Sequence, residues 1–366
     1  MELGIRHLCN ESGVMTMIVP YPLSNQTYAG KLRKMFTHDY CLYQIVDLNG
    51  TKVFENATVT NCIPFVHRGP QCETVSIAHI DEQKHITIFF EQPLDQLRQD
   101  EKSEVWNLTQ EIRNTNRHNG MCVLGDFCYI SVGMVINADE RTAKGEFKKE
   151  ELISLTKDAI HCREYIEAKD IERYRVKRVR YLEYNTVRVP DKLRRPTFRE
   201  LYDRKKLVIN CLGGLNTALD LNHNYLHNHS IYCAVLWKDF EGVKNKSIDS
   251  SIKKFSTKSR KEMVELSKDI DLLYLMGILN SKYAKVLLDN NRGGDYHIYP
   301  EHVRNIPIPH ATPAQQQPII DLVDTILAKK KQNPQADTSV EENAIDKLIY
   351  QLYGLTEEEI SLIENG

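Results

Sequence analysis

The spacing of the apolar residues changes along this chain of 366 residues, and the change limits the folds open to it. Short apolar runs, typical of strands, occur at residues 13–20, 42–46, 59–66 and 86–90. Residues 24–36 instead place apolar side chains at helical spacing, behind Ser24 as a candidate N-cap. A strand, a helix and a strand in that order predict a βαβ crossover within a mostly parallel sheet, with the first run as a buried strand.

The rest of the chain has a different pattern. Residues 91–120 are polar and are expected to form a helical linker, and a new unit is expected to begin near residue 121. Its predicted strands are at 129–136, 205–210 and 231–237. Apolar residues then return at helical spacing, which predicts helices at 272–287, 315–331, 338–352 and from 356 on. Capping-box patterns at Thr338 with Glu341 and at Thr356 with Glu359 support the last two.

Several classes of protein are excluded or disfavoured by composition. No apolar run approaches the length that spans a bilayer, and no signal-peptide pattern opens the chain, so we expect no membrane partner and a cytoplasmic location. The nine cysteines include no Cys-x-x-Cys pair, which disfavours a zinc ribbon. Without a secretory signal, free thiols are the expected state.

The strongest physical signal is a basic segment at residues 163–206, which holds 15 Lys and Arg against 8 Asp and Glu although the whole chain has a net charge of −2. Tyrosines are interleaved with these cations. Basic side chains neutralise phosphates and Arg can read guanine, so the segment predicts binding to double-stranded DNA. The alternative is a solvated surface balanced by nearby acids. The predicted contacts from this segment are Arg173, Arg175, Lys177, Arg178, Arg180, Arg194, Arg195, Lys205 and Lys206.

Other motifs are weak. Gly213-Gly214 follows a strand, but neither phosphate-binding glycine pattern is present, so a turn is favoured. His223, His227 and His229 lie in an Asn-rich stretch that indicates a turn more than a metal site. Lys148 to Glu151 is a mixed charge run, which indicates a solvated face. We find no paired carboxylates or nucleophile–base arrangement at a convincing spacing, and no metal site is predicted.

Eight segments in order resemble one family, the adenine-N6 DNA methyltransferases that carry a target-recognition domain after the catalytic domain, as in TaqI-like and type IIG restriction–modification enzymes. The match extends over nearly the whole chain, and the joint order is specific where each segment alone is weak. The segments are Gly13 to Pro20, Ala29 to Arg33, Val53 to Val59, Leu124 to Gly133, Lys169 to Tyr174, Tyr274 to Ser281, Tyr299 to Pro309 and Ile345 to Thr356.

The resemblance implies a division of the chain. The expected fold is α/β, a partial Rossmann-like methyltransferase sheet followed by an α+β recognition domain and a helical C-terminus. The implied bounds are 1–95 for the end of the catalytic domain, 96–120 for a linker, 121–310 for the recognition domain and 311–366 for C-terminal helices. Side chains near 137–141, 213–216 and 292–297 would approach bases, among them Asn216, Arg292 and Tyr296.

The sequence also departs from the family. The glycine loop that binds S-adenosylmethionine and the Asn-Pro-Pro-Tyr loop that grips the flipped adenine are absent; Val19 to Pro22 is the nearest string. By resemblance Phe54 would stack on the flipped base, although a core Phe is an equal alternative. We therefore predict no cofactor and no methylation by this chain alone. Two alternatives stay open: an enzyme completed in trans by an N-terminal methyltransferase half, and a remnant that binds DNA without specificity. Any nuclease of the parent enzyme would lie upstream.

Overall fold

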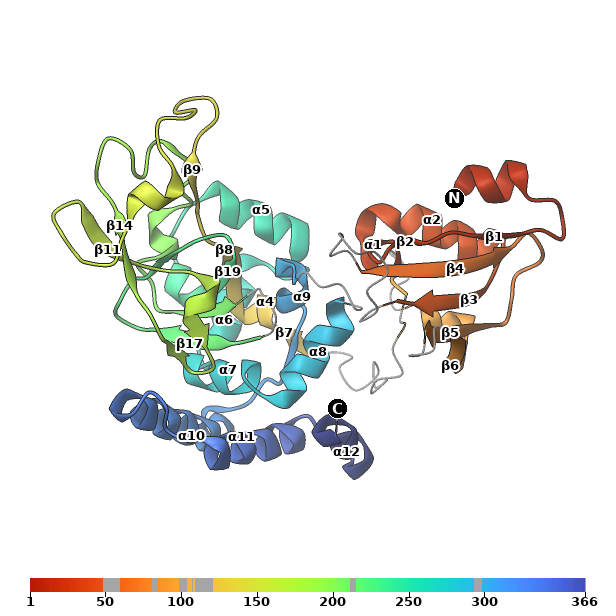
Figure 1. The fold of residues 1–366 in the computed structure, drawn as a ribbon. Coiled ribbons are helices and arrows are strands. Elements are labelled where there is room, and N and C mark those ends of the chain that lie inside the picture. The colour runs from red at the N-terminus through yellow and green to blue at the C-terminus, as the bar shows by residue number, and fades with distance from the viewer. Residues whose placement is uncertain are drawn as a thin grey trace. The chain divides into compact units, whose positions relative to one another are not determined.

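The computed structural model describes residues 1–48, 60–80, 85–98, 104–106, 108, 121–210, 215–292 and 298–365, with the backbone alone at 27, 290–292 and 365 (Figure 1). The chain divides into two compact units. The first comprises Met1–Arg113 with Asp289–His297, and the second Asn114–Leu288 with Ile298–Gly366. Both are mixtures of helices and strands, and several small sheets and a helical C-terminal part make the protein mixed α/β. The predicted domain bounds at 95, 120 and 310 stay predictions.

A six-stranded sheet forms the body of the first unit. Its order is β1-β4-β3-β5-β6, and β2 also pairs with β4. The predicted strands at 42–46, 59–66 and 86–90 are confirmed as β3, β4 and β6, whereas β5 was not predicted. The strands are β1 (Val14–Thr16), β2 (Val19–Pro20), β3 (Cys41–Asp47), β4 (Asn61–His67), β5 (Thr74–Ile80) and β6 (Ile86–Pro93).

The relative directions of the strands in this sheet differ from the expectation based on the sequence. Among the described pairs β3 and β5 run in parallel, but β1, β2 and β3 are each antiparallel to β4, and β5 is antiparallel to β6. The predicted mostly parallel sheet is therefore wrong, because β4 returns between β1 and β3. The run at 13–20 is also not one buried strand: it forms two short strands, and Val14, Met17 and Ile18 are exposed.

Short helical turns cover one face of the sheet (Figure 1). Phe36 packs with Trp106 and with sheet residues in the core of this unit, so Trp106 from the predicted linker is a core residue. The predicted helix at 24–36 is broken into several turns, and Ser24 lies inside the first of them instead of capping it. The elements are η1 (Gly4–Leu8), α1 (Pro22–Asn25), η2 (Thr27–Ala29), α2 (Gly30–Lys34), η3 (Met35–Asp39) and α3 (Leu94–Leu97).

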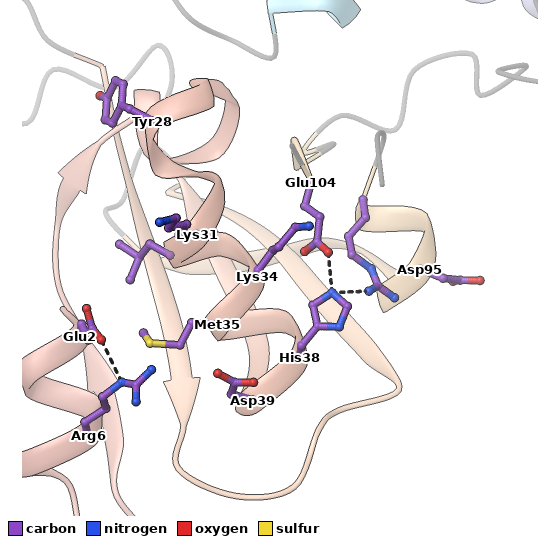
Figure 2. A pocket seen from close by; sticks show the side chains of 12 residues that line it. Glu2, Arg6, Tyr28, Lys31, Lys34, Met35, His38, Asp39, Asp95 and Glu104 are labelled. Atoms are coloured by element: carbon purple, nitrogen blue, oxygen red, sulfur yellow. Dashed lines mark hydrogen bonds and ion pairs between the residues drawn. The ribbon is translucent and has the colours of Figure 1, made fainter. Parts of the chain in front are cut away.

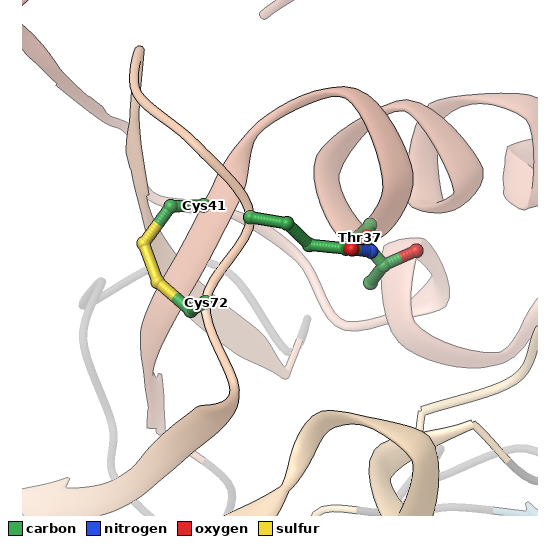
Figure 3. Close-up of a disulfide and its surroundings, with 4 residues drawn as sticks. Thr37, Cys41 and Cys72 are labelled. Atoms are coloured by element: carbon green, nitrogen blue, oxygen red, sulfur yellow. Dashed lines mark hydrogen bonds between the residues drawn. A yellow bond between two sulfur atoms is a disulfide. The ribbon is translucent and has the colours of Figure 1, made fainter.

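A disulfide joins Cys41 at the start of β3 to Cys72 before β5 (Figure 3), with 4.8 Å between their Cα atoms. Next to it, the side-chain amide of Gln71 donates to the carbonyl oxygen of Thr37. The two bonds tie the β4–β5 connection to the start of β3 and to η3. The expectation of free thiols is therefore wrong for Cys41 and Cys72. Other described cysteines are free, namely Cys9, Cys62, Cys122, Cys128, Cys162 and Cys233.

The second unit contains two four-stranded sheets and several two-stranded ribbons. One sheet has the order β17-β16-β19-β8 and is antiparallel; the other has the order β10-β14-β11-β18, with β11 and β18 parallel. The predicted strands at 205–210 and 231–237 are confirmed as β16 and β19, and the one at 129–136 forms β8 and β9. The first sheet comprises β8 (Cys128–Val132), β16 (Lys206–Asn210), β17 (Thr217–Asp220) and β19 (Ile231–Leu236). The second comprises β10 (Ile153–Ser154), β11 (His161–Ile166), β14 (Arg180–Glu183) and β18 (Leu226–His227).

Ribbons and single turns complete the β part of this unit, and Tyr129, Trp237 and Phe240 lie in the largest described core cluster. The Ile-Pro-Ile-Pro stretch is extended, as its prolines predict, and pairs as β20 with β7. The ribbon strands are β7 (Cys122–Val123), β9 (Val135–Ala138), β12 (Ile171–Glu172), β13 (Arg175–Val176), β15 (Leu193–Arg195) and β20 (Pro307–Ile308). The short helical turns are α4 (Leu124–Phe127), η4 (Lys149–Leu152), η5 (Ala168–Asp170), η6 (Arg199–Leu201) and η7 (Trp237–Phe240).

The predicted helices in the last third of the chain are confirmed, but one of them is divided into two. The stretch at 272–287 forms two helices, because the Asn280 side chain bonds both backbone groups of Thr217, each at 2.9 Å, and Ser281 starts a new helix. Thr356 and Glu359 form the expected capping box, whereas the Thr338 hydroxyl bonds Glu342 and does not cap. The helices are α5 (Lys246–Phe255), α6 (Arg260–Ser267), α7 (Leu272–Leu279), α8 (Lys282–Arg292), α9 (Pro300–Arg304), α10 (Pro313–Gln332), α11 (Ser339–Leu352) and α12 (Glu357–Asn365). None of the helices in the described ranges has the length and apolar character needed to cross a membrane.

Candidate nucleic-acid interface

Part of the basic segment folds into a hairpin of two strands followed by a third strand. Tyr174, with a φ of 67°, turns the chain between β12 and β13, and β14 follows. Lys169, Lys177 and Arg178 line a shallow hollow of about 450 Å³. Their side chains are 64%, 42% and 52% exposed, so all three can meet a ligand from solvent.

Carboxylates hold these cations in a network. Asp170 accepts from Arg178 at 3.1 Å and from Arg180 at 2.6 Å. Glu167 lies 2.6 Å from Lys149 and 3.1 Å from Lys169. Burial raises the pKa of Glu167, but the hydrogen bonds from the two lysines outweigh it and bring the pKa down to about 2. Glu167 therefore stays ionised, and the hydrogen bonds and ion pairs to Asp170 and Glu167 fix the cations in place.

A second basic group adjoins this network through Lys149. The Arg195 guanidinium donates to the carbonyl oxygen of Gly133 at 3.2 Å. Burial lowers the pKa of His229, and the positive charges of Arg195 and Lys149 lower it further. Four segments that are far apart in the sequence therefore meet here.

We call this group the basic band and define it as Lys149, Lys169, Arg175, Lys177, Arg178, Arg180 and Arg195. Seven cations face three carboxylates, Glu167, Asp170 and Glu172. The band keeps a net charge of +4, so it attracts a polyanion although most of its members are paired. The sequence analysis did not predict Lys149 as a contact, because the charge run around it indicates only a solvated face.

Two predicted contacts are buried. Lys206 is fully buried, and its ammonium donates to Asp220 at 2.6 Å and to the carbonyl oxygen of Tyr202 at 2.7 Å. Arg180 is 8% exposed and is held between Asp170 and Glu167. Arg180 pairs with the carboxylates that hold the exposed cations of the band. Lys206 belongs to the core of the β17-β16-β19-β8 sheet.

The remaining described contacts lie apart from the band. Arg173 points to the helices, 2.7 Å from Glu342 and 2.5 Å from the carbonyl oxygen of Asn280. Arg194 is exposed, 3.9 Å from Glu140, and Lys205 is exposed. Asn216 is half-buried, and its carbonyl oxygen accepts from the backbone of Asn210.

Three predicted residues cannot be placed. Phe54 and Tyr296 lie outside the described residues. Arg292 ends α8, but its side chain lies outside the description as well. The roles predicted for them stay predictions.

The three histidines do not converge. His223 pairs with Glu164, His227 is buried in the core and His229 is exposed near Arg195. In the ranges that the structure describes, no group of three or more His, Cys, Asp or Glu side chains is placed to hold a metal ion.

The first unit contains a larger cavity of about 1120 Å³ (Figure 2). In it, Nε2 of His38 lies 2.5 Å from Glu104 and 3.0 Å from Arg98, and the exposed Lys31 and Lys34 line the wall. Charged side chains of both signs surround the cavity. Tyr28, Leu32 and Met35 line it as well, and we assign no ligand to this cavity.

Comparisons with known proteins relate this fold to restriction–modification enzymes. No family model matches the sequence, and no curated protein matches it either. The solved structure of MmeI, a type IIL restriction–modification enzyme in complex with DNA, matches with a TM-score of 0.57 and 10% identity, over 96% of this chain and 48% of that one. This chain thus spans about half the length of MmeI and shares its fold over that part.

Two further structures match less well. A nuclease-deletion mutant of the type ISP enzyme LlaGI, in complex with a DNA substrate mimic, has a TM-score of 0.44 and 12% identity, over 87% of this chain and 35% of that one. The type ISP enzyme LlaBIII bound to DNA has a TM-score of 0.41 and 12% identity, over 87% of this chain and 25% of that one.

Proposed function

We propose that this chain is the DNA-recognition part of an adenine-N6 DNA methyltransferase in a restriction–modification system. The observation that carries the proposal is the fold shared with MmeI over 96% of this chain, in a structure that contains DNA. The eight segments that resemble the adenine-methyltransferase family point the same way. In this proposal the second unit recognises DNA and the first is the end of a Rossmann-like catalytic domain.

The basic band supplies the physical means of binding. Lys169, Lys177 and Arg178 are exposed around one hollow, and cations so placed neutralise phosphates and release counterions. Their carboxylate partners hold them before DNA arrives, which reduces the side-chain entropy lost on binding. Phosphate contacts position a protein on the duplex, and base contacts from neighbouring loops would specify the sequence.

We propose no methyl transfer by this chain alone. The S-adenosylmethionine loop and the Asn-Pro-Pro-Tyr loop are absent from its 366 residues. The purified chain should therefore transfer no labelled methyl group to DNA. Transfer in the absence of any added protein would contradict this part of the proposal.

A second candidate function is an enzyme completed in trans. β6 ends the described order of its sheet and exposes Ile86, Ile88 and Phe89, each by more than half. An edge strand with exposed apolar side chains is a ready surface for another chain. Methyl transfer that appears only when a methyltransferase N-terminal half is added would favour this candidate, and failure of the two proteins to associate would count against it.

Selection from a random duplex library tests the main proposal. The full chain is incubated with the library at about 50 and 150 mM salt, and the retained DNA is sequenced. A short motif recovered at the higher salt is the expected result. Retention that yields no motif and disappears as the salt rises would show binding to phosphates without recognition, the behaviour of a non-specific remnant.

A further inference from the structure

The tip of the β12–β13 hairpin is docked on β17 and on the helices that follow it. Tyr174, at the tip, is buried, and its backbone nitrogen donates to the carbonyl oxygen of Thr217 at 2.9 Å. The same oxygen accepts from the side-chain amide of Asn280, also at 2.9 Å. Arg173 donates to the carbonyl oxygen of Asn280 at 2.5 Å and lies 2.7 Å from a carboxylate oxygen of Glu342 on α11. We call these five residues the clasp: Arg173, Tyr174, Thr217, Asn280 and Glu342.

The opposite end of the hairpin carries the exposed cations of the hollow. The backbone nitrogen of Lys177 donates to the carbonyl oxygen of Asp170 at 2.8 Å, and this bond closes the base of the hairpin. Lys169 precedes this pair in the chain, Arg178 follows it, and both line the hollow together with Lys177. The clasp thus holds the tip of the element whose base presents these cations.

A hairpin of this size depends on its surroundings for its position. β12 and β13 have two residues each, and an isolated two-stranded hairpin is at best marginally stable in water. The buried Asp170, which accepts from Arg180, fixes the start of β12. Lys177 and Arg178, which follow β13, pair with carboxylates through side chains that are largely exposed, and such pairs contribute little. The position of β13 and of these two cations therefore depends on the buried tip.

Arg173 differs in its surroundings from the cations at the hollow. Its guanidinium has two acceptors, the carbonyl oxygen of Asn280 and the carboxylate of Glu342. Asn280 is buried and Glu342 is 17% exposed, so a phosphate that recruited Arg173 would leave both acceptors poorly compensated. The arrangement favours a cation that holds the hairpin over one that meets DNA.

We propose that Arg173 is a positioning residue for DNA binding: it holds the hairpin through Glu342 and Asn280, and Lys177 and Arg178 at the other end meet the phosphates. Arg173 itself contacts no DNA. This inference rests on the proposed function and deepens it, because it separates the cations of one segment into those that bind the duplex and one that places them.

The first test separates positioning from contact by the salt dependence of binding. Binding of the full chain to a random-sequence duplex is measured between about 50 and 150 mM salt. Arg173→Met keeps an aliphatic side chain and should weaken binding by about fivefold, because the hairpin must then be ordered when DNA binds. The slope of log K against log salt should stay within about 0.3 of wild type, since the number of neutralised phosphates is unchanged. A phosphate contact would instead lower the slope by about 0.9, as expected for Lys177→Ala.

The second test uses the sign of the effect at Glu342. Removal of a negative charge by itself strengthens attraction to DNA. The inference predicts the opposite for Glu342→Gln, a weakening of about threefold, because the clasp loses its carboxylate. Glu341→Gln is the matched control: it removes the same charge from the next residue of α11, which pairs with Lys329 outside the clasp, and should not weaken binding. Arg173→Met/Glu342→Gln should bind as Arg173→Met does, because both residues act in one clasp.

Urea denaturation establishes that each variant is folded under the binding conditions. If Arg173→Met does not fold, the sign of the Glu342→Gln effect against Glu341→Gln decides. A slope lowered by about 0.9 in Arg173→Met, or stronger binding by Glu342→Gln, would make Arg173 a DNA contact and overturn the inference while the proposed function stands. Unchanged binding by both folded variants would overturn it as well, because the clasp would then serve stability alone. Absence of DNA binding by wild type would overturn both the inference and the proposed function.

Discussion

The ammonium group of Lys206 lies 2.6 Å from Oδ2 of Asp220, and both side chains are buried in the second unit. Asp220 also receives three backbone hydrogen bonds from residues 223–225, so its carboxylate is saturated. Among the residues that the structure describes, Lys206 donates to Asp220 and to the Tyr202 carbonyl oxygen. Loss of the Asp220 side chain therefore leaves more buried polar groups without a partner than loss of the Lys206 side chain does.

This inequality predicts different costs for the two substitutions. Asp220→Ala leaves a buried ammonium and three unpaired backbone N–H groups, and should lower the free energy of unfolding by about 3–5 kcal/mol. Lys206→Met fills a similar volume and leaves a carboxylate that still has three donors, so it should cost less. Urea denaturation of both variants measures the difference. Equal losses would contradict the inequality.

The tertiary structure also requires a glycine at position 133. A Cβ at this position would lie 2.1 Å from the carbonyl oxygen of His227 and 2.4 Å from that of Asn228. Both are backbone atoms that cannot move aside cheaply, so Gly133→Ala should cost about 3 kcal/mol or more.

Gly145→Ala is the matched control for Gly133→Ala. Gly145 has a φ of +77° with no atom within 4 Å of its Cβ position, so the substitution should cost only the backbone strain of about 1–2 kcal/mol. Urea denaturation curves of the two variants are compared. If Gly133→Ala proves no more costly than Gly145→Ala, the described contact with His227 is wrong.

The buried His227 predicts a loss of stability in mild acid. Burial lowers the pKa of His227 to about 3, and the nearby charge of Lys206 contributes, whereas a hydrogen bond to the Asn228 carbonyl opposes the shift. The folded pKa lies below the unfolded value of about 6.5, so as pH falls below 6.5 the unfolded chain takes up the proton first. Stability is full above about pH 6.5 and falls by up to about 1.4 kcal/mol per pH unit towards pH 3.

The measurement is the free energy of unfolding of wild type and His227→Gln at pH 7.5, 6.0 and 5.0. Between about pH 6.5 and 5.0 the wild type should lose about 2 kcal/mol more than the variant. Glu167 adds little in this window, because its pKa is lowered to about 2. Parallel pH profiles for the two proteins would show that His227 is not buried as a neutral ring.

The salt dependence of DNA binding reports on individual cations of the basic band. Removing one phosphate contact should reduce the slope of log K against log salt by about 0.9. Lys177→Ala and Arg178→Ala should each show this change, since both side chains are exposed at the hollow. Lys206→Met, measured under conditions in which it is folded, should leave the slope unchanged because Lys206 is buried. A reduced slope for Lys206→Met would contradict the burial.

A count of free thiols tests the disulfide between Cys41 and Cys72. Alkylation of the unfolded chain without reductant should modify two fewer thiols than alkylation after reduction. The bond closes a loop of 31 residues, so reduction should lower the stability of the first unit by about 3–4 kcal/mol. A Cys41→Ser/Cys72→Ser variant should match the reduced protein. Identical alkylation under both conditions would refute the bond.

Local chemistry explains which elements were predictable. The strands at 42–46, 205–210 and 231–237 are dense apolar runs, and the helices after residue 311 have apolar residues at regular spacing, so short-range patterns are sufficient. The direction of the first sheet was not predictable. Strand order depends on β4, which follows residues 48–60 and inserts between β1 and β3, and no local pattern encodes such an insertion.

The sequence by itself determined that this chain is rich in cations between residues 163 and 206, and it predicted a resemblance to one family without two of that family's loops. Only the tertiary structure decided which of those cations face solvent. Lys177 and Lys206 are the same residue type in the same segment, yet the first lies at an open hollow and the second is buried against Asp220. A charge count cannot distinguish them, because burial and pairing depend on strands and turns that come from distant parts of the chain.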